Sequence, residues 1–167
     1  MIRFMVIGLP RSGTAWAANW LTTDTSLCLH DPLFERHYSE LDAINSRKRL
    51  GVSCTGLFNW PDWLNAHPAR KIVLHRPLRE INESLEQCGL ANMDEKAVRK
   101  LERVNGRHFD WRAIFDDPAT IYEYLIEKPF DPERHAELVK LNVQRDFGRI
   151  VVSKQVTKML MQEVMAA

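Results

Sequence analysis

The residues best suited to chemistry lie in one short segment, from Gly8 to Thr14, which reads GLPRSGT. Gly8 and Gly13 stand five positions apart, which is the spacing of the glycines in a phosphate-binding loop. Thr14 follows the second glycine, where a nucleoside triphosphatase carries lysine, and the cation of the loop, Arg11, precedes that glycine. We therefore expect the loop to hold phosphate-like groups, but not ATP in the usual manner.

A loop of this kind binds an anion largely through its backbone. The N–H groups of residues 12–15 would point at the anion from the start of a helix, where the helix dipole adds a favourable potential. Arg11 adds a full charge and a forked set of donors. A tight strand-to-helix turn without a ligand is the alternative, because one glycine-spaced loop is a weak signal.

A second pair of residues, Arg76 and Ser84, follows the next clear strand. Arg76 comes directly after the apolar residues 72–74 and the histidine that follows them, and Ser84 lies eight positions later, within a helical pattern. On their own, these two residues indicate only a cation at a sheet edge and a hydroxyl two turns along a helix.

Together the two segments resemble the sulfotransferase family that uses 3′-phosphoadenosine-5′-phosphosulfate (PAPS). The first resembles that family's 5′-phosphosulfate loop and the second its 3′-phosphate motif, in the same order and with the same Arg-to-Ser spacing. A weaker similarity to the family lies at residues 114–118, where acidic residues and a proline precede a helix. The likeness is good over residues 2–20 and 72–87. The segments that carry it are Pro10-Arg11-Ser12-Gly13-Thr14-Ala15-Trp16 and Arg76-Pro77-Leu78-Arg79-Glu80-Ile81-Asn82-Glu83-Ser84.

The resemblance implies a role for each matching residue. Arg11 would contact the bridging and sulfuryl oxygens and stabilise the departing phosphate. Arg76 and Ser84 would bind the 3′-phosphate. The ring of Trp16 would stack on adenine, although an indole on a helix face is equally suited to the core. The rest of the cofactor-binding loop, around the 5′-phosphate, would comprise Pro10, Ser12, Gly13, Thr14 and Ala15.

The chain departs from the family pattern at three points. Ala15 replaces the second hydroxyl residue of the loop and removes one donor to phosphate. The late Arg-Lys-Gly segment that helps to hold the 3′-phosphate in the cytosolic members has no clear copy. The 167 residues are fewer than most members have, so we expect reduced lid and acceptor-pocket segments.

Sulfuryl transfer is an in-line displacement, in which a protein positions the reactants and neutralises charge on the leaving phosphate. On this interpretation the reaction requires no metal. The acceptor would be a hydroxyl or amine of a small molecule or glycan, and it would gain from a general base. His30, after a short strand, is the first candidate for that base, and Asp31, Glu35 and His37 are the others.

Two other functions stay open on the sequence. A P-loop kinase or nucleotide hydrolase would use Asp31 to hold Mg²⁺ through water, but it would need the lysine that Thr14 replaces. A binding module of the same fold would keep the nucleotide and lack turnover. The aromatic cluster of Phe58, Trp60 and Trp63 would line an acceptor pocket, belong to the core or form a partner surface.

These residues need a scaffold that brings strand ends together, and the hydrophobic pattern predicts one. We expect strands at 2–7, 26–29, 51–57, 71–75 and 149–152, helices at 13–21, 33–45 and 77–88, and a Trp-rich turn at 59–63. Three further helices would begin at a capping box of Asn92 and Glu95, at Asp117-Pro118 and at Asp131-Pro132, and a last one would follow residue 152. The pattern predicts one α/β domain over residues 1–167, a three-layer sandwich with a largely parallel central sheet. The resemblance implies the P-loop NTPase-like sulfotransferase version of that fold.

Composition limits the partners. The chain has 45% hydrophobic and 27% charged residues with a net charge of +1, which is ordinary for a globular protein and gives no reason to expect nucleic acid or a membrane surface. Short basic runs such as residues 47–49 suit a solvated face. No signal pattern or bilayer-length apolar run is present, and three cysteines without metal-ligand spacing favour a reducing, cytoplasmic setting. The oligomeric state stays open.

Overall fold

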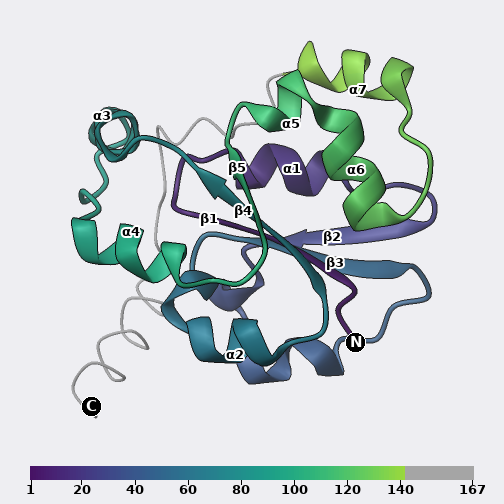
Figure 1. Cartoon of the computed structure of the whole chain (residues 1–167), viewed down its shortest axis with the longest axis horizontal. Helices are drawn as coiled ribbons and strands as arrows, with labels where there is room; N and C mark the ends of the chain where they lie inside the picture. The colour runs from purple at the N-terminus through teal and green to yellow at the C-terminus, as the bar shows by residue number, and fades with distance from the viewer. Residues whose placement is uncertain (142–167) are drawn as a thin grey trace.

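The computed structural model describes residues 1–141, and these form a five-stranded parallel sheet with helices on both faces (Figure 1). The strand order is β2-β3-β1-β4-β5. The strands are β1 (Phe4–Gly8), β2 (Ser26–His30), β3 (Arg49–Cys54), β4 (Arg70–His75) and β5 (Arg107–Asp110). The α-helices are α1 (Thr14–Trp20), α2 (Pro61–Ala66), α3 (Leu78–Gln87), α4 (Glu95–Glu102), α5 (Ala113–Asp116), α6 (Pro118–Ile126) and α7 (Pro132–Val139). Short 3₁₀ turns are η1 (Pro32–Phe34), η2 (Tyr38–Ala43) and η3 (Leu57–Asn59).

The central strand β1 is buried on both faces, which explains its continuous apolar sequence. Met5 and Ile7 belong to one hydrophobic cluster, whereas Phe4 and Val6 belong to the other. The side chains of β4, the second clear strand, are likewise shared between the two clusters, and Val73 belongs to the first. The α/β sandwich with a parallel central sheet that the sequence predicts is thereby confirmed.

Different helices cover the two faces of the sheet, and Figure 1 shows α1, α5, α6 and α7 on one side with α2 and α4 on the other. Trp20 of α1 and Leu125 of α6 belong to the cluster on the first face. Leu64 of α2 and Leu101 of α4 belong to the cluster on the second face. Each helix therefore contributes an apolar stripe to one of two separate cores.

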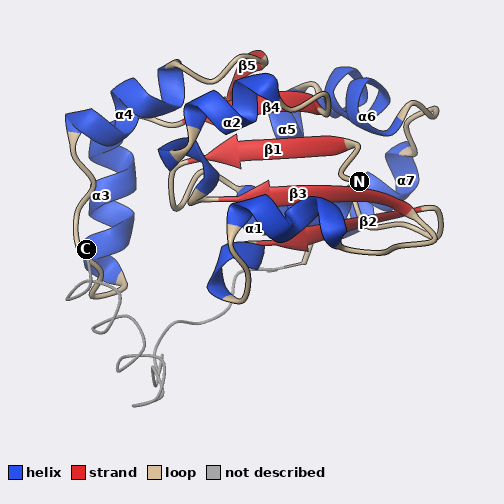
Figure 2. Cartoon of the chain, turned by 90° about the horizontal axis from the view of Figure 1, so that it is seen from below, coloured by secondary structure: helices blue, strands red, loops and turns tan. Residues whose placement is uncertain are grey.

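The helices that follow β1 and β4 leave the sheet toward opposite faces. Trp16 of α1 joins one core, and Ile81 of α3 joins the other. β1 and β4 are neighbours, so the loops that follow them diverge at the carboxyl ends of the strands, the usual ligand position in such sheets. In Figure 2 the arrowheads of β1 and β3 point toward the end of the molecule where α3 lies.

Several local predictions are wrong. The helix predicted at 33–45 is two 3₁₀ turns, η1 and η2, and the turn predicted at 59–63 contains the start of α2. The cap of α4 is Asp94, whose carboxylate accepts from the Ala97 N–H, and not Asn92. Strand β5 was not predicted at all, whereas the predicted strand at 149–152 lies outside the described residues. None of the helices in residues 1–141 is long and apolar enough to cross a bilayer.

Candidate functional site

The loop between β1 and α1 has two residues in the left-handed backbone region. Gly13 has a φ of 84°, which costs a glycine little, and a Cβ added there would lie 2.8 Å from Ile114 Cδ1. Arg11 has a φ of 67°, a conformation that costs a residue with a Cβ, such as arginine, about 1–2 kcal/mol. The loop closes tightly, since the Ser12 N–H donates to the Leu9 carbonyl at 3.2 Å.

Two buried serines lie at the start of α1. The Ser53 hydroxyl, at the end of β3, donates to the Thr14 carbonyl at 2.7 Å and is fully buried. Ser12 is also fully buried, but its hydroxyl has no hydrogen-bond partner among the described residues. A buried hydroxyl without a partner costs about 1–3 kcal/mol, so this atom is suited to pairing with a bound group.

Arg11, Arg76 and Ser84 converge at the carboxyl ends of β1 and β4. Arg11 Nε donates to the Ser84 hydroxyl at 2.8 Å across 73 positions of sequence. One terminal nitrogen of Arg76 donates to the Arg11 carbonyl at 2.6 Å across 65 positions. The structure therefore brings together the three residues that the sequence picks from two separate segments.

The Arg76 guanidinium is held from two more sides. Its Nε lies 3.1 Å from a carboxylate oxygen of Glu80, one turn further along α3. Its central carbon lies 4.5 Å from the ring centre of Trp111, which follows β5. Such a stack orients a guanidinium and leaves other donors available. Sequence reasoning did not identify Trp111, because its place depends on the unpredicted strand β5.

Trp16 lies in the core of the α1 face. Its side chain is 7% exposed, and its ring centre lies 5.4 Å from that of Trp20 and 4.7 Å from that of Phe115. His135 of α7 approaches edge-on, with ring centres 5.2 Å apart. The indole thus packs as the helical spacing of Trp16 and Trp20 indicates, and its stacking on adenine stays a prediction.

His30 and Asp31 lie together at the carboxyl end of β2. His30 Nε2 is 3.2 Å from Asp31 Oδ2, and the imidazole is 39% exposed whereas the carboxylate is 11% exposed. The other carboxylate oxygen accepts from the Thr55 N–H at 2.6 Å and from the Thr55 hydroxyl at 3.0 Å. Asp31 is therefore anchored to the segment after β3 and is placed to orient His30.

The other two candidate bases lie on the surface beyond η1. His37 Nδ1 pairs with the Ser39 hydroxyl at 2.7 Å, so this imidazole is hydrogen-bonded within its own turn. Glu35 is exposed and ends η1. Of the four candidates, only His30 and Asp31 are coupled to each other and to a second strand end.

The aromatic residues singled out in the sequence divide between core and surface. Phe58 is buried in the core, at 4% exposure. Trp60 and Trp63 are half-buried and flank Tyr38, with ring-centre distances of 4.8 Å and 5.5 Å. They join η2 to the segment after β3.

The strand order sets the separation of the two groups of residues. One strand, β3, lies between β2 and β1, so two strand spacings, about 10 Å, separate the strand that carries His30 from the strand that leads to Arg11. Ser53, in β3, bonds to Thr14 at the start of α1, and Thr55, just after β3, bonds to Asp31. Sequence reasoning missed these contacts, because nothing in the local pattern marks them.

Two kinds of site are not favoured by the geometry. Residues 1–141 contain no group of three or more His, Cys, Asp or Glu side chains arranged to hold a metal ion. Burial raises the pKa of the Cys54 thiol to about 12, so this cysteine, close to Asp31, stays protonated at neutral pH. A thiolate nucleophile therefore has no support at this strand end.

We compared the chain with protein-family models and with curated proteins. No family model matches it. No curated protein gives a significant match. The functional assignment therefore rests on the residues and geometry described above.

Proposed function

We propose that the protein is a PAPS-dependent sulfotransferase, which transfers a sulfuryl group to a hydroxyl or amine of a small molecule or glycan. The observation that carries this proposal is the convergence of Arg11, Arg76 and Ser84. The motif likeness lies in two separate segments, and the fold unites them through two hydrogen bonds that join residues 73 and 65 positions apart. Chance surface residues would have no reason to meet in this way.

The residues present fit a nucleotide with a 3′-phosphate. A phosphate monoester is a dianion, and guanidinium forks with a hydroxyl donor match its oxygens. Arg76 and Ser84 supply these donors beside the loop. The buried Ser12 hydroxyl and the tight Gly13 turn suit a second phosphate within the loop itself. Thr14, in place of lysine, argues against the usual ATP site.

PAPS would supply an activated sulfuryl group and a phosphate leaving group. Arg11 would place its guanidinium beside the oxygens on which negative charge develops. Its hydrogen bond to Ser84 ties that cation to α3, so the charge is held in position before the reaction. The work of the loop is therefore electrostatic stabilisation and alignment.

His30 is the proposed general base for the acceptor. Its Nε2 faces the Asp31 carboxylate, so a neutral imidazole would carry its proton on that nitrogen and leave Nδ1 to accept one. Asp31 would stabilise the imidazolium that forms. The strand that carries His30 and the strand that leads to Arg11 stand about 10 Å apart, so an acceptor hydroxyl and a sulfuryl group would have to bridge that separation.

Calorimetric binding of 3′-phosphoadenosine-5′-phosphate (PAP), beside ADP and ATP, tests the proposal. Each titration is run with Mg²⁺ and again with EDTA. We expect PAP to bind at least tenfold more tightly than ADP, independently of the metal. Preference for ATP in the presence of Mg²⁺ would instead indicate a divergent phosphotransferase. Tight PAP binding without transfer to any acceptor would indicate a binding module.

A further inference from the structure

We infer that Arg112 is a second cation of the 3′-phosphate site, beside Arg76. This inference rests on the proposed function and extends it to a residue outside both motifs. The 3′-phosphate would then lie between two guanidinium groups, one following β4 and the other following β5. The sequence has no clear copy of the late Arg-Lys-Gly segment that the resemblance would lead us to expect, and Arg112 offers a cation from another segment.

The first observation is that both arginines share one aromatic ring. The central carbon of Arg76 lies 4.5 Å from the ring centre of Trp111, and that of Arg112 lies 5.1 Å from it. A guanidinium stacked on an indole keeps its N–H donors directed outward in its own plane. Trp111 therefore holds two cations close together, with donors available to an anion.

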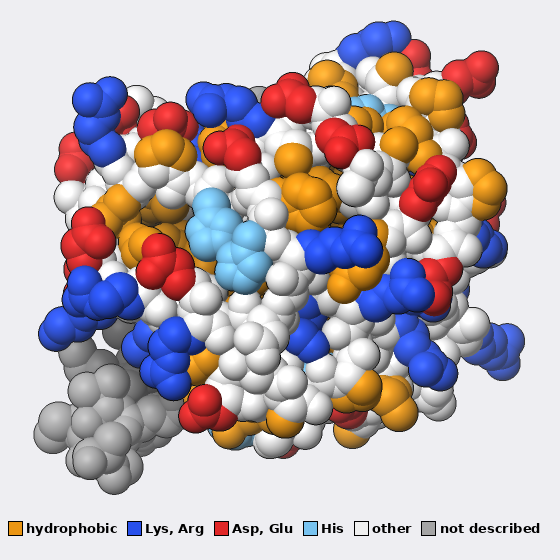
Figure 3. Space-filling model, in the orientation of Figure 1, with side chains coloured by type: hydrophobic (Ala, Val, Ile, Leu, Met, Phe, Trp, Pro, Cys, Tyr) orange, Lys and Arg blue, Asp and Glu red, His pale blue; other side chains and the backbone are white. Residues whose placement is uncertain are grey.

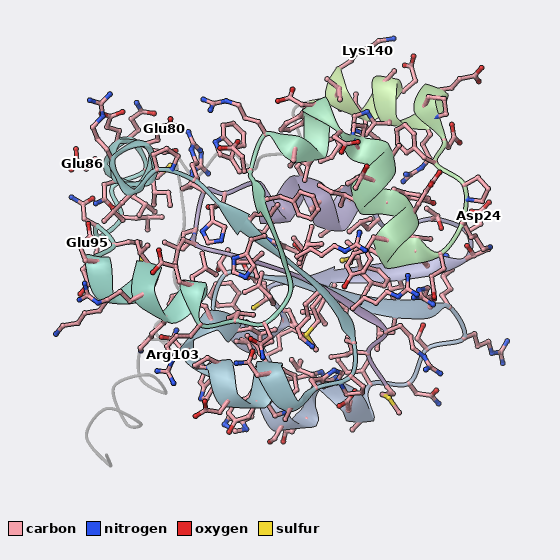
Figure 4. All side chains as sticks on the ribbon, viewed as in Figure 1. Asp24, Glu80, Glu86, Glu95, Arg103 and Lys140 are labelled. Carbon is pink, nitrogen blue, oxygen red and sulfur yellow. The ribbon has the colours of Figure 1, made fainter. Side chains whose placement is uncertain are left out.

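The second observation is that both arginines also share one carboxylate. Arg76 Nε lies 3.1 Å from Glu80 Oε2, and Arg112 lies 3.7 Å from Glu80 Oε1. Figure 4 shows Glu80 on α3, next to the space between that helix and the β5–α5 segment. One carboxylate faces two guanidinium groups, so the cluster carries a net positive charge before Arg11 is counted. That balance favours a dianion such as a phosphate monoester.

The edge strand places Arg112 where this cluster needs it. Asp110 pairs with His75 in the sheet register, and the Trp111 N–H donates to the His75 carbonyl at 2.9 Å. The Asp110 carboxylate accepts from the Arg112 N–H at 2.8 Å, which turns the chain at the strand end. The Arg112 side chain stays 54% exposed, so its guanidinium can reach a ligand.

Calorimetric binding of PAP and ADP to Arg112→Ala tests the inference. We expect PAP to bind about tenfold more weakly, since a charged hydrogen bond is lost, whereas ADP affinity changes less than about twofold. Arg112→Lys keeps the charge and should recover most of the lost PAP affinity. Arg79→Ala is the matched control, because Arg79 is 87% exposed on α3, pairs with Glu83 and should leave both affinities unchanged.

Two outcomes would overturn the inference. If the unmodified protein does not prefer PAP over ADP, the proposed function and this extension of it both fail. If the protein prefers PAP but Arg112→Ala keeps that preference, or loses affinity equally for both nucleotides, the second-cation role alone is wrong. Thermal melting of each variant separates a loss of folding from a loss of binding.

Discussion

The two groups of candidate residues differ in how the fold holds them. Arg11, Arg76 and Ser84 are linked across 65 and 73 positions of sequence, so their arrangement depends on the packing of β1, β4 and α3. His30 and Asp31 are neighbours in the chain and depend on a local contact plus Thr55. On the proposed function the first group would bind the nucleotide, and the second would offer a half-exposed imidazole to exchange protons. Substitutions in the two groups should therefore separate affinity from turnover.

The largest effect is expected from His30→Ala. General bases contribute about 10²–10⁴-fold to rate, so we expect turnover to fall at least 100-fold. PAP affinity should stay within about twofold, because His30 lies on the other side of β3 from the phosphate loop. Steady-state kinetics and calorimetry measure the two quantities separately. Unchanged turnover would move the base to Asp31, Glu35 or His37.

Arg76→Ala should give the opposite pattern. Removing a guanidinium that would bind a dianion costs about 1.5–3 kcal/mol, equivalent to a loss of about 10–150-fold in PAP affinity. ADP, which lacks the 3′-phosphate, should lose much less. Calorimetry with both nucleotides provides the comparison. Equal losses would mean that Arg76 supports only the Arg11 carbonyl and the loop conformation.

Asp31→Ala is expected to reduce stability as well as turnover. It leaves the Thr55 N–H and hydroxyl without their acceptor, at a cost of about 1–3 kcal/mol in the free energy of unfolding. Asp31→Asn keeps an acceptor oxygen and should recover most of that stability, but it removes the negative charge beside His30. Urea unfolding measures the stability of both variants. Equal destabilisation by the two substitutions would argue against the proposed anchoring.

The smallest effect concerns the paired histidines His75 and His108. Figure 3 shows a patch of histidine side chains on the surface, in pale blue. His108 Nε2 donates to the Val104 carbonyl, so its Nδ1 accepts from His75 Nε2 at 2.7 Å. Burial, and to a smaller extent the charge of His108, lower the pKa of His75. The charges of Glu102 and Asp110 act in the opposite direction and raise that pKa.

Because the folded-state pKa of His75 is lowered, the unfolded chain binds more protons just below pH 6.5. The free energy of unfolding should therefore fall as the pH decreases through about 6.5 and level off below the folded-state pKa. His75→Gln should be less stable than the parent at pH 8 by about 1 kcal/mol, and the difference should shrink toward pH 5. Urea unfolding across this range would contradict the assignment if the two proteins lost stability in parallel.

The central strands and their loops were predictable because their sequence has to satisfy burial on both faces. The continuous apolar runs of β1 and β4 have this origin, and the glycine spacing marks the loop that follows β1. Strand β5 was missed because it has four residues, three of them exposed, at the edge of the sheet. Its pairing with β4 determines the strand, and no local pattern reports that pairing.

The residues of the candidate site divide in the same way, into those that the local sequence marks and those that it does not. Arg11, Arg76 and Ser84 could be selected from residue type and spacing. Trp111 and Thr55 could not, because their contacts exist only once strand ends from distant segments meet. The helix predicted at 33–45 failed for a related reason. Tertiary contacts there, such as the Asp42 carboxylate that accepts from the Ile2 N–H, stabilise a 3₁₀ turn instead.

The end of β3 has a consequence for how an acceptor would be chosen. Ser53 bonds to the start of α1 and Thr55, just after the strand, bonds to Asp31, so the end of β3 connects the β1–α1 loop with the His30–Asp31 pair. A paired strand in the middle of a sheet acts as a rigid spacer, and its width does not adjust to a ligand. The distance between the two groups would then select the acceptor. An acceptor whose nucleophilic atom spans this fixed distance would react, whereas a shorter or bulkier one would bind without reacting.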